Sequence, residues 1–149
     1  MAMHESIKPQ SCRVQITNGV AAALANRFCR RDTAATEDDV MITHVPGAAG
    51  APAQGVLAMK ATSLRTLATD TYLATTSYVR PDGCEATIEL GEAVTQRGAP
   101  LRIGGNSTEV DGAAYLADAQ GDYIVGYAAE VGAVGQIIRF EFINAGLVP

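Results

Sequence analysis

Residues whose side chains could perform catalysis are sparse in this chain. The two histidines are His4 and His44, and the three cysteines are Cys12, Cys29 and Cys84. A Cys–His pair would supply a nucleophile and its base, but nothing in the local sequence marks any of the cysteines as a nucleophile. We interpret His44 as a partly exposed structural residue of a strand and the cysteines as buried and unreactive. The sequence therefore predicts no catalytic residues.

Metal and nucleotide sites also lack their required spacing. No CxxC or HxxxH pair is present to hold two zinc ligands on one local segment. Gly50 and Gly55 have the spacing of a P-loop, but Val56 and Leu57 stand where that loop needs a lysine and a hydroxyl residue. A phosphate would find neither a positive charge nor a magnesium ligand there. We expect no metal and no cofactor.

Charged residues gather at two places in the first third of the chain. The acidic run 37–39 (Glu-Asp-Asp) is interpreted as a solvated loop, because consecutive carboxylates do not converge on one ion. Arg27, Arg30 and Arg31 form the one basic cluster of the sequence. Arginine recognises carboxylates with a planar fork of donors, so these three are candidate contacts with an acidic protein surface. The alternative is a solvated sheet edge that prevents strand-to-strand aggregation.

Composition indicates a small acidic protein of one domain. The chain has 149 residues, with 16 acidic and 11 basic side chains and a net charge of -5. This balance opposes binding to nucleic acid by neutralisation of phosphates. The chain has no tryptophan, three phenylalanines and five tyrosines. Because such a composition fills little core volume, we expect additional burial against a partner.

Secretion and membrane insertion are not expected from the sequence. The odd number of cysteines argues against a disulfide scaffold and indicates synthesis in a reducing cytoplasm. Residues 1–10 lack the apolar core of a signal peptide. No segment reaches the roughly 18 apolar residues of a membrane span. We expect a soluble protein with no membrane partner.

Alternating apolar and polar residues predict short strands along most of the chain. The expected strands are residues 12–16, 40–45, 55–59, 72–79, 84–90, 101–103, 123–128 and 137–143. Residues 63–74 also fit helical spacing, but their threonines favour a strand. The turn sequence 80–83 (Arg-Pro-Asp-Gly) predicts that 72–79 and 84–90 form a hairpin with one solvated face.

Short strands separated by glycine-rich turns predict an all-β fold, a compact β-barrel or β-sandwich of antiparallel strands. Polar residues 1–11 are predicted to be a flexible, extended N-terminal arm, and residues 12–149 a single β domain. Residues 20–30 faintly resemble residues 93–102. Two related β-units, at about 12–60 and 84–149, would explain this similarity. Chance similarity in an alanine-rich chain is the alternative.

Two segments of the second half resemble a known protein family. GEAVTQRGAPLRIGG (91–105) and GDYIVGYAAEVGAVGQIIRFEFI (121–143) are similar to the closing part of capsid cement proteins, also called head decoration proteins, of tailed bacteriophages. The segments ANRF (25–28) and QGVLAM (54–59) fit the same pattern more loosely. The arm and residues 64–74 have no counterpart in the pattern.

The resemblance implies a non-enzymatic structural protein of the virion. A protein of this family would be made in the host cytoplasm and would bind the outer surface of the expanded phage head as a homotrimer. There it would clamp neighbouring major capsid protein subunits, without direct contact to nucleic acid. Symmetric multivalent binding lets many weak contacts add up to a stable attachment.

Two other functions are compatible with the sequence. A small oligomeric β-barrel enzyme with a site between protomers would make Asp70, Asp82 or Asp111 important, although aspartates at such positions usually form turns. The base of a phage fibre or receptor-binding protein would be a similar β-trimer. Exposed aromatic residues that bind sugars would favour the latter, but most aromatic residues lie on strands that resemble core strands.

Overall fold

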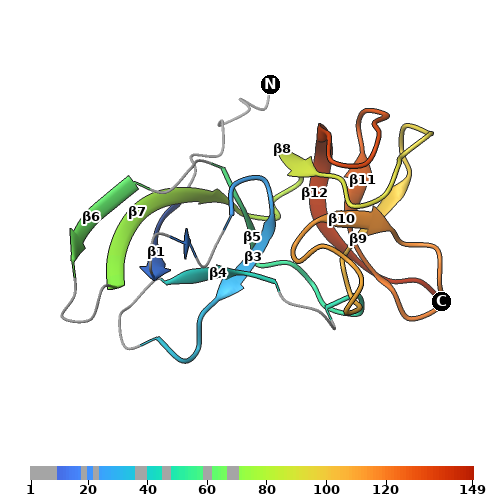
Figure 1. Cartoon of the computed structure of the whole chain (residues 1–149). Helices are drawn as coiled ribbons and strands as arrows, with labels where there is room; N and C mark the ends of the chain where they lie inside the picture. The colour runs from blue at the N-terminus through green and yellow to red at the C-terminus, as the bar shows by residue number, and fades with distance from the viewer. Residues whose placement is uncertain are drawn as a thin grey trace, which may run out of the picture.

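The structure is a computed structural model that describes residues 10–17, 20–21, 24–35, 40–44, 48–58, 62–66 and 71–149. These residues form twelve β-strands and no helix. The strands make two antiparallel sheets, which lie side by side in Figure 1. The all-β prediction is therefore confirmed. Among the described residues, no helix has the length and apolar character that crossing a bilayer requires.

The first sheet contains seven strands in the order β2-β1-β7-β5-β3-β4, with β6 paired to β7. They are β1 (Gln10–Thr17), β2 (Val20–Ala21), β3 (Phe28–Arg31), β4 (Met41–Thr43), β5 (Gly55–Leu57), β6 (Thr62–Thr66) and β7 (Thr71–Val79). The sheet curls, because β1 pairs with β7 and also lies against β4. A small apolar cluster of this sheet comprises Cys12, Val14, Cys29, Met41 and Leu57.

The second sheet contains five strands in the order β10-β9-β11-β12-β8. They are β8 (Cys84–Glu89), β9 (Pro100–Ile103), β10 (Ala114–Leu116), β11 (Tyr123–Ala128) and β12 (Ile137–Leu147). Leu90, directly after β8, forms a parallel bridge with Ala114 of β10. The Gly91 amide also donates a hydrogen bond to the Ala114 carbonyl at 2.9 Å. These contacts join the two edges, so the sheet approaches a closed barrel.

Three phenylalanine rings join the two sheets. Phe28 comes from β3, whereas Phe140 and Phe142 come from β12, and all three are fully buried. The Phe28 ring meets Phe140 edge-on, with centroids 5.6 Å apart, and Phe142 with centroids 5.9 Å apart. Edge-to-face pairs are stabilised electrostatically as well as by burial. The largest core cluster contains residues of both sheets and has these rings among its members.

Polar contacts also cross between the two sheets. The Asn144 side chain accepts a hydrogen bond from the Ala53 amide at 3.1 Å and donates one to the Ala53 carbonyl at 2.8 Å. The Tyr123 amide donates to the Ala49 carbonyl at 2.8 Å. These bonds satisfy backbone groups that would otherwise be buried without partners. The segment before β5 is therefore tied to β11 and β12 of the second sheet by hydrogen bonds.

A glycine in the loop between β9 and β10 allows that loop to approach the first sheet closely. Gly112 has a φ of 69°, and a Cβ atom there would stand 2.5 Å from Thr43 Cγ2 and 2.8 Å from the Phe28 carbonyl oxygen. The Gly112 carbonyl accepts a hydrogen bond from the Phe28 amide at 2.7 Å, so this loop and β3 form one tight junction. A side chain at this position would push the loop away from the first sheet.

The predicted hairpin of residues 72–79 and 84–90 is wrong. Both strands and the bend exist, but β7 pairs with β1, β5 and β6, whereas β8 pairs with β12. The Gly83 amide donates to the Phe142 carbonyl at 2.9 Å, so the chain enters the second sheet as soon as it leaves the bend. The residues of a turn specify a change of direction, and they do not specify the partner of the next strand.

Other sequence expectations agree with the structure within its described residues. Ala86 and Ile88 of β8 are buried while Glu85 and Thr87 are exposed, as alternation predicts. The ambiguous segment 63–74 is extended where it is described, in β6 and β7. Of the predicted arm, residues 1–9 lie outside the described residues and residues 10–11 belong to β1.

The predicted repeat places its matching segments on comparable strands. Phe28 lies on β3, which pairs with β5, and Leu101 lies on β9, which pairs with β11. The similarity aligns Phe28 with Leu101 and Gly55 with Gly126. The strand registers differ by one residue from this alignment, because Gly55 is opposite Cys29 whereas Gly126 is opposite Leu101. The division into two related units, and the single domain that contains them, stay predictions.

We expect Phe28→Ala to lower the free energy of unfolding by about 3–5 kcal/mol, because it removes the ring that joins the sheets and leaves a cavity. Leu24→Ala is the matched control, since Leu24 is 47% exposed and its loss should change stability by less than about 0.5 kcal/mol. Urea unfolding followed by tyrosine fluorescence measures both. Equal effects of the two substitutions would contradict the role given to Phe28.

A second comparison separates the close approach at Gly112 from its backbone conformation. Gly135 also has a positive φ, 81°, but no atom lies within 4 Å of its Cβ position. We expect Gly135→Ala to cost about 1 kcal/mol from the left-handed conformation alone. Gly112→Ala should cost an additional ~1–3 kcal/mol from the clash between the sheets. The same loss in both variants, measured by thermal unfolding, would show that the junction yields without strain.

Candidate functional site

The three arginines predicted to contact a partner have different surroundings. Arg27 bridges the sheets: its Nη2 lies 2.8 Å from Glu89 Oε2, and its Nη1 donates to the Asp111 carbonyl at 2.8 Å. Its side chain is 11% exposed, which leaves little of the guanidinium for an external partner. Arg27 therefore stabilises the junction between the sheets.

Arg30 and Arg31 occupy successive positions at the end of β3. Arg30 Nη1 donates a long hydrogen bond, 3.5 Å, to the Arg31 carbonyl. The exposed Arg31 donates its backbone amide to Gln54 Oε1 at 2.6 Å, and its side chain lines a cleft near the bend after β7. The basic cluster of the sequence is thus divided between the junction of the sheets and this cleft.

His44 directly follows β4 and is buried, with 6% of its surface exposed. Its backbone amide donates to the Phe28 carbonyl at 3.0 Å, and its Nε2 has no hydrogen-bond partner. Burial, reinforced by the positive charge of Arg30, lowers the pKa of His44 to about 4. The imidazole is therefore neutral at physiological pH. His44 is structural as expected, but the expectation that it would be partly exposed is wrong, because it packs beside the junction of the sheets.

The cysteines occupy two environments. Cys12 and Cys29 are buried in the apolar cluster of the first sheet, and Cys84 is half-buried at the start of β8. Burial, with a smaller effect from the neighbouring Cys12, raises the pKa of Cys29 far above its ordinary value. A thiol that stays protonated is a poor nucleophile. None of the three cysteines is in a disulfide bond.

Of the acidic residues that the sequence singled out, Asp82 and Asp111 lie among the described residues. The run 37–39 and residue 70 lie outside the described residues. Asp82 is exposed in the bend after β7, where its amide donates to the Arg80 carbonyl at 2.9 Å. Asp111 is exposed and contributes its carbonyl to Arg27. Within the described residues, no group of three or more His, Cys, Asp or Glu side chains could hold a metal ion.

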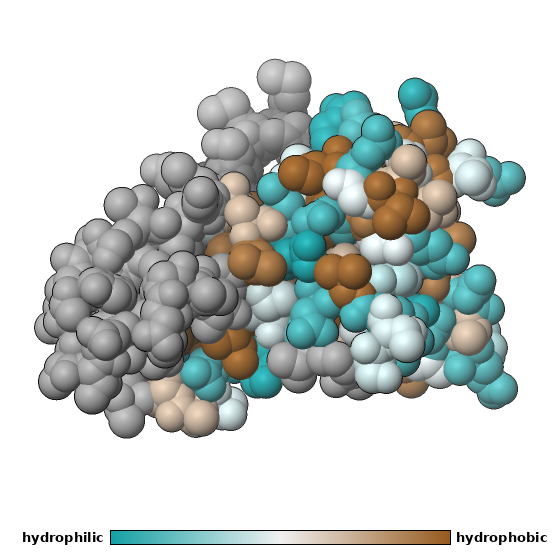
Figure 2. Space-filling model, viewed as in Figure 1, coloured by the Kyte–Doolittle hydropathy of each residue, from teal (hydrophilic) through white to brown (hydrophobic). Residues whose placement is uncertain are grey.

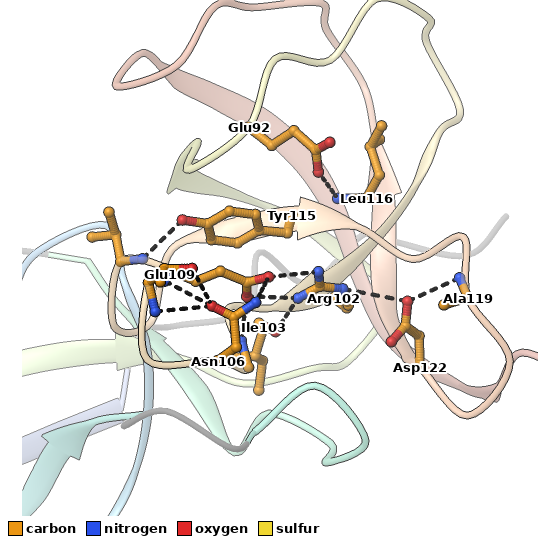
Figure 3. A network of polar contacts seen from close by, with 12 residues as sticks. Glu92, Arg102, Ile103, Asn106, Glu109, Tyr115, Leu116, Ala119 and Asp122 are labelled. Atoms are coloured by element: carbon orange, nitrogen blue, oxygen red, sulfur yellow. Dashed lines mark hydrogen bonds and ion pairs between the residues drawn. The ribbon is translucent and has the colours of Figure 1, made fainter.

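An arginine-centred polar network, which sequence reasoning missed, lies at the second sheet (Figure 3). Arg102 of β9 donates to both carboxylate oxygens of Glu109, at 2.9 and 2.8 Å. Its Nε lies 3.3 Å from Asp122 Oδ2, an ion pair rather than a hydrogen bond. The guanidinium also lies 5.3 Å from the centroid of the Tyr115 ring. The signal in the sequence is an arginine between two buried apolar residues, Leu101 and Ile103.

This network stabilises the loop between β9 and β10. Glu109 accepts hydrogen bonds from the Gly105 amide and from Asn106 Nδ2, and the Tyr115 hydroxyl accepts one from the Val110 amide at 2.8 Å. The hydrogen bond from Arg102 lowers the pKa of Glu109, and the same contact raises the pKa of Arg102. Both groups stay charged through the physiological range, which suits a structural link and not proton transfer.

Exposed apolar side chains are concentrated in one hairpin of the second sheet. Val131, Val134 and Ile137, in and beside the connection from β11 to β12, are 54%, 65% and 54% exposed. Figure 2 shows apolar residues of the second sheet, in brown, interspersed with polar ones on the face in view. Exposed apolar groups of this kind are common at protein contacts.

The architecture has a counterpart among solved structures. The crystal structure of the N base of head fiber gp8.5 in bacteriophage phi29 matches this chain with a TM-score of 0.58. The two chains share a fold. The match covers 94% of this chain and 100% of that chain, at 18% sequence identity. No protein-family model matches this chain, and no curated protein does so.

The burial of His44 predicts a stability that depends on pH. An unfolded histidine gains its proton near pH 6.5, whereas His44 in the folded chain gains one only at about 4. The stability that the neutral His44 ring contributes is therefore fully present above pH 6.5. It is lost as the pH falls from 6.5 towards 4, by up to roughly 3 kcal/mol.

Urea unfolding from about pH 7 to about pH 4 tests this expectation against His44→Leu, which cannot titrate. The carboxylates titrate in both proteins, so their contribution cancels in the difference. We expect the unfolding free energy of the wild type to fall more than that of the variant as the pH falls. A constant difference would show that His44 gains its proton at the same pH in the folded and the unfolded chain, which would contradict the lowered pKa.

Proposed function

We propose that this chain is a non-enzymatic structural protein of a bacteriophage head. The observation that carries the proposal is the fold shared with a head-fibre base over 94% of the chain. The similarity of residues 91–105 and 121–143 to capsid cement proteins supports the same class. The two lines of support are separate, since one compares backbones and the other compares residues.

Within that class, we propose a cement or decoration protein on the outer surface of the expanded head. As a homotrimer, it would bind neighbouring major capsid protein subunits and hold them together. A clamp has to transmit force between its contacts without bending in the middle. The junction of the sheets suits this requirement, because aromatic packing, the Arg27–Glu89 ion pair and the Asn144 hydrogen bonds act together there.

The base of a head fibre is the second candidate function. It is favoured by the solved structure that shares the fold, which is described as the base of such a fibre. The two functions differ in the number of copies bound per head and in their effect on the stability of the head. A cement protein occupies sites across the whole capsid and stabilises it, whereas a fibre base attaches a projecting structure at a limited set of positions.

Binding to capsids tests the proposal and separates the two functions. Purified protein is co-sedimented with expanded heads that lack it, and the bound copies are counted by quantitative gel densitometry. For a cement protein we expect saturation at about one copy per major capsid subunit, as symmetric occupancy requires. The same preparation should raise the temperature at which the heads release their DNA.

Unexpanded shells and competition with unlabelled protein are the controls. Binding to expanded heads alone, displaced by unlabelled protein, would support the cement function. Saturation at far fewer copies, without a change in head stability, would instead support the fibre base. Absence of binding at micromolar concentration would contradict both functions.

A further inference from the structure

Three of the six large apolar side chains that are exposed among the described residues lie within residues 131–137. They are Val131, Val134 and Ile137, and the other three are spread over the rest of the described chain. Single exposed apolar residues are ordinary on a protein surface, whereas a group of them is typical of a contact site. The connection from β11 to β12, which holds this group, therefore has the surface chemistry of a protein contact.

The tip of this connection has a fixed conformation. The Gln136 amide donates to the Ala133 carbonyl at 3.1 Å, and Gln136 Oε1 accepts a hydrogen bond from the Ala133 amide at 2.8 Å. These two bonds close a turn that has Val134 and Gly135 at its centre, and the Gly135 amide donates to the Leu90 carbonyl at 2.7 Å. A contact made through an ordered tip costs less conformational entropy than one made through a mobile loop. The exposed Val134 side chain is thus held in place before any partner binds.

An open hollow of about 470 Å³ adjoins the exposed apolar group. It is lined by Arg97, Glu130, Val131, Gln136, Ile137 and Ile138. Ile138 is buried, whereas Arg97 is exposed. Hydrogen bonds from Arg139, and in smaller part the positive charges of Arg139 and Arg97, lower the pKa of Glu130, so its carboxylate stays charged. The lining therefore holds one charge of each sign beside its apolar side chains.

A second copy of this chain suits this surface. Each copy has a net charge of -5, so two copies repel one another unless they meet where the local charges balance. The hollow meets that condition, because Arg97 and Glu130 are the charged residues that line it. In a ring of identical copies, Arg97 of one copy can pair with Glu130 of the next. A surface that holds both members of a charge pair is self-complementary, as a contact between identical copies requires.

We propose that the connection from β11 to β12, with the hollow beside it, is the contact between copies of this chain. This step rests on the proposed function, in which the chain is a homotrimer, and it assigns the surface through which the protomers meet. Burial of Val131, Val134 and Ile137 would add apolar burial to a chain that has no tryptophan and three phenylalanines. Nucleic acid is a poor occupant, because the hollow has no excess of positive charge to neutralise phosphates.

Self-association measures this contact directly. Sedimentation equilibrium of the full chain is run from about 1 to about 100 μM, the range in which a contact of moderate affinity dissociates. We expect the mass of the wild type to rise to that of a trimer. Val134→Asp should weaken self-association by roughly tenfold or more, because the contact would bury an unpaired carboxylate. Val110→Asp is the matched control, since Val110 is 45% exposed in the loop between β9 and β10 and does not line the hollow.

Arg97→Glu tests the charges of the hollow. It places two carboxylates there, so we expect weaker self-association, with a loss that shrinks as salt is added. Arg80→Glu is the control, because it makes the same change of charge at an exposed position directly after β7. Thermal unfolding of each variant establishes that it is folded. A wild type that stays monomeric over the whole range, or equal losses in the tested variants and their controls, would overturn the proposal.

Binding of the same proteins to expanded heads separates the contact from the proposed function. If the wild type trimerises through this surface and binds no heads, the contact stands and the proposed function fails. If the wild type binds heads as a monomer and Val134→Asp binds them as Val110→Asp does, the capsid function stands and the contact is overturned. If the monomer instead loses head binding with Val134→Asp alone, the surface meets the capsid and not a second copy, which also overturns the proposal.

Discussion

The arrangement of this molecule depends on the burial of Phe28 against Phe140 and Phe142. A short strand of the first sheet supplies one ring and the longest strand of the second sheet supplies the other two. In a chain without tryptophan, these rings are the largest of the fully buried side chains among the described residues. Each edge-to-face pair is worth about 0.5–1.5 kcal/mol beyond its burial. The rings therefore decide that two curled sheets pack into one structure.

The polar groups near this core follow from the same constraint. Backbone and charged groups that the junction removes from water require partners, because a buried polar group without one destabilises the fold. Asn144 supplies both hydrogen bonds of Ala53, and Glu89 and the Asp111 carbonyl satisfy Arg27. The Arg102 network does the same for the loop that reaches towards the first sheet. The ion pairs of Arg27 and Arg102 are thus used in stabilisation.

What remains for interaction is at the surface and not in a buried centre. His44 is held neutral and Cys29 protonated, so neither serves as a ready proton acceptor or nucleophile at physiological pH. The exposed apolar side chains in and beside the connection from β11 to β12 are groups of the kind that bind other proteins. This division between a rigid interior and scattered contact groups is consistent with a structural component of a larger assembly.

The sequence by itself determined the all-β class, most strand positions and the inward faces of strands such as β8, because a period of two residues is a local property. It also gave the thin core and the few candidate groups for catalysis. Only the tertiary structure decided that β7 and β8 belong to different sheets, that Arg27 pairs with Glu89, and that Arg31 meets Arg80 across a cleft. Such contacts join residues that are far apart in the sequence, as Arg27 and Glu89 are, at 62 positions. The alternation of a strand and the residues of its turn are the same whichever strand it pairs with. The pairing of strands therefore depends on which packing buries the three phenylalanine rings.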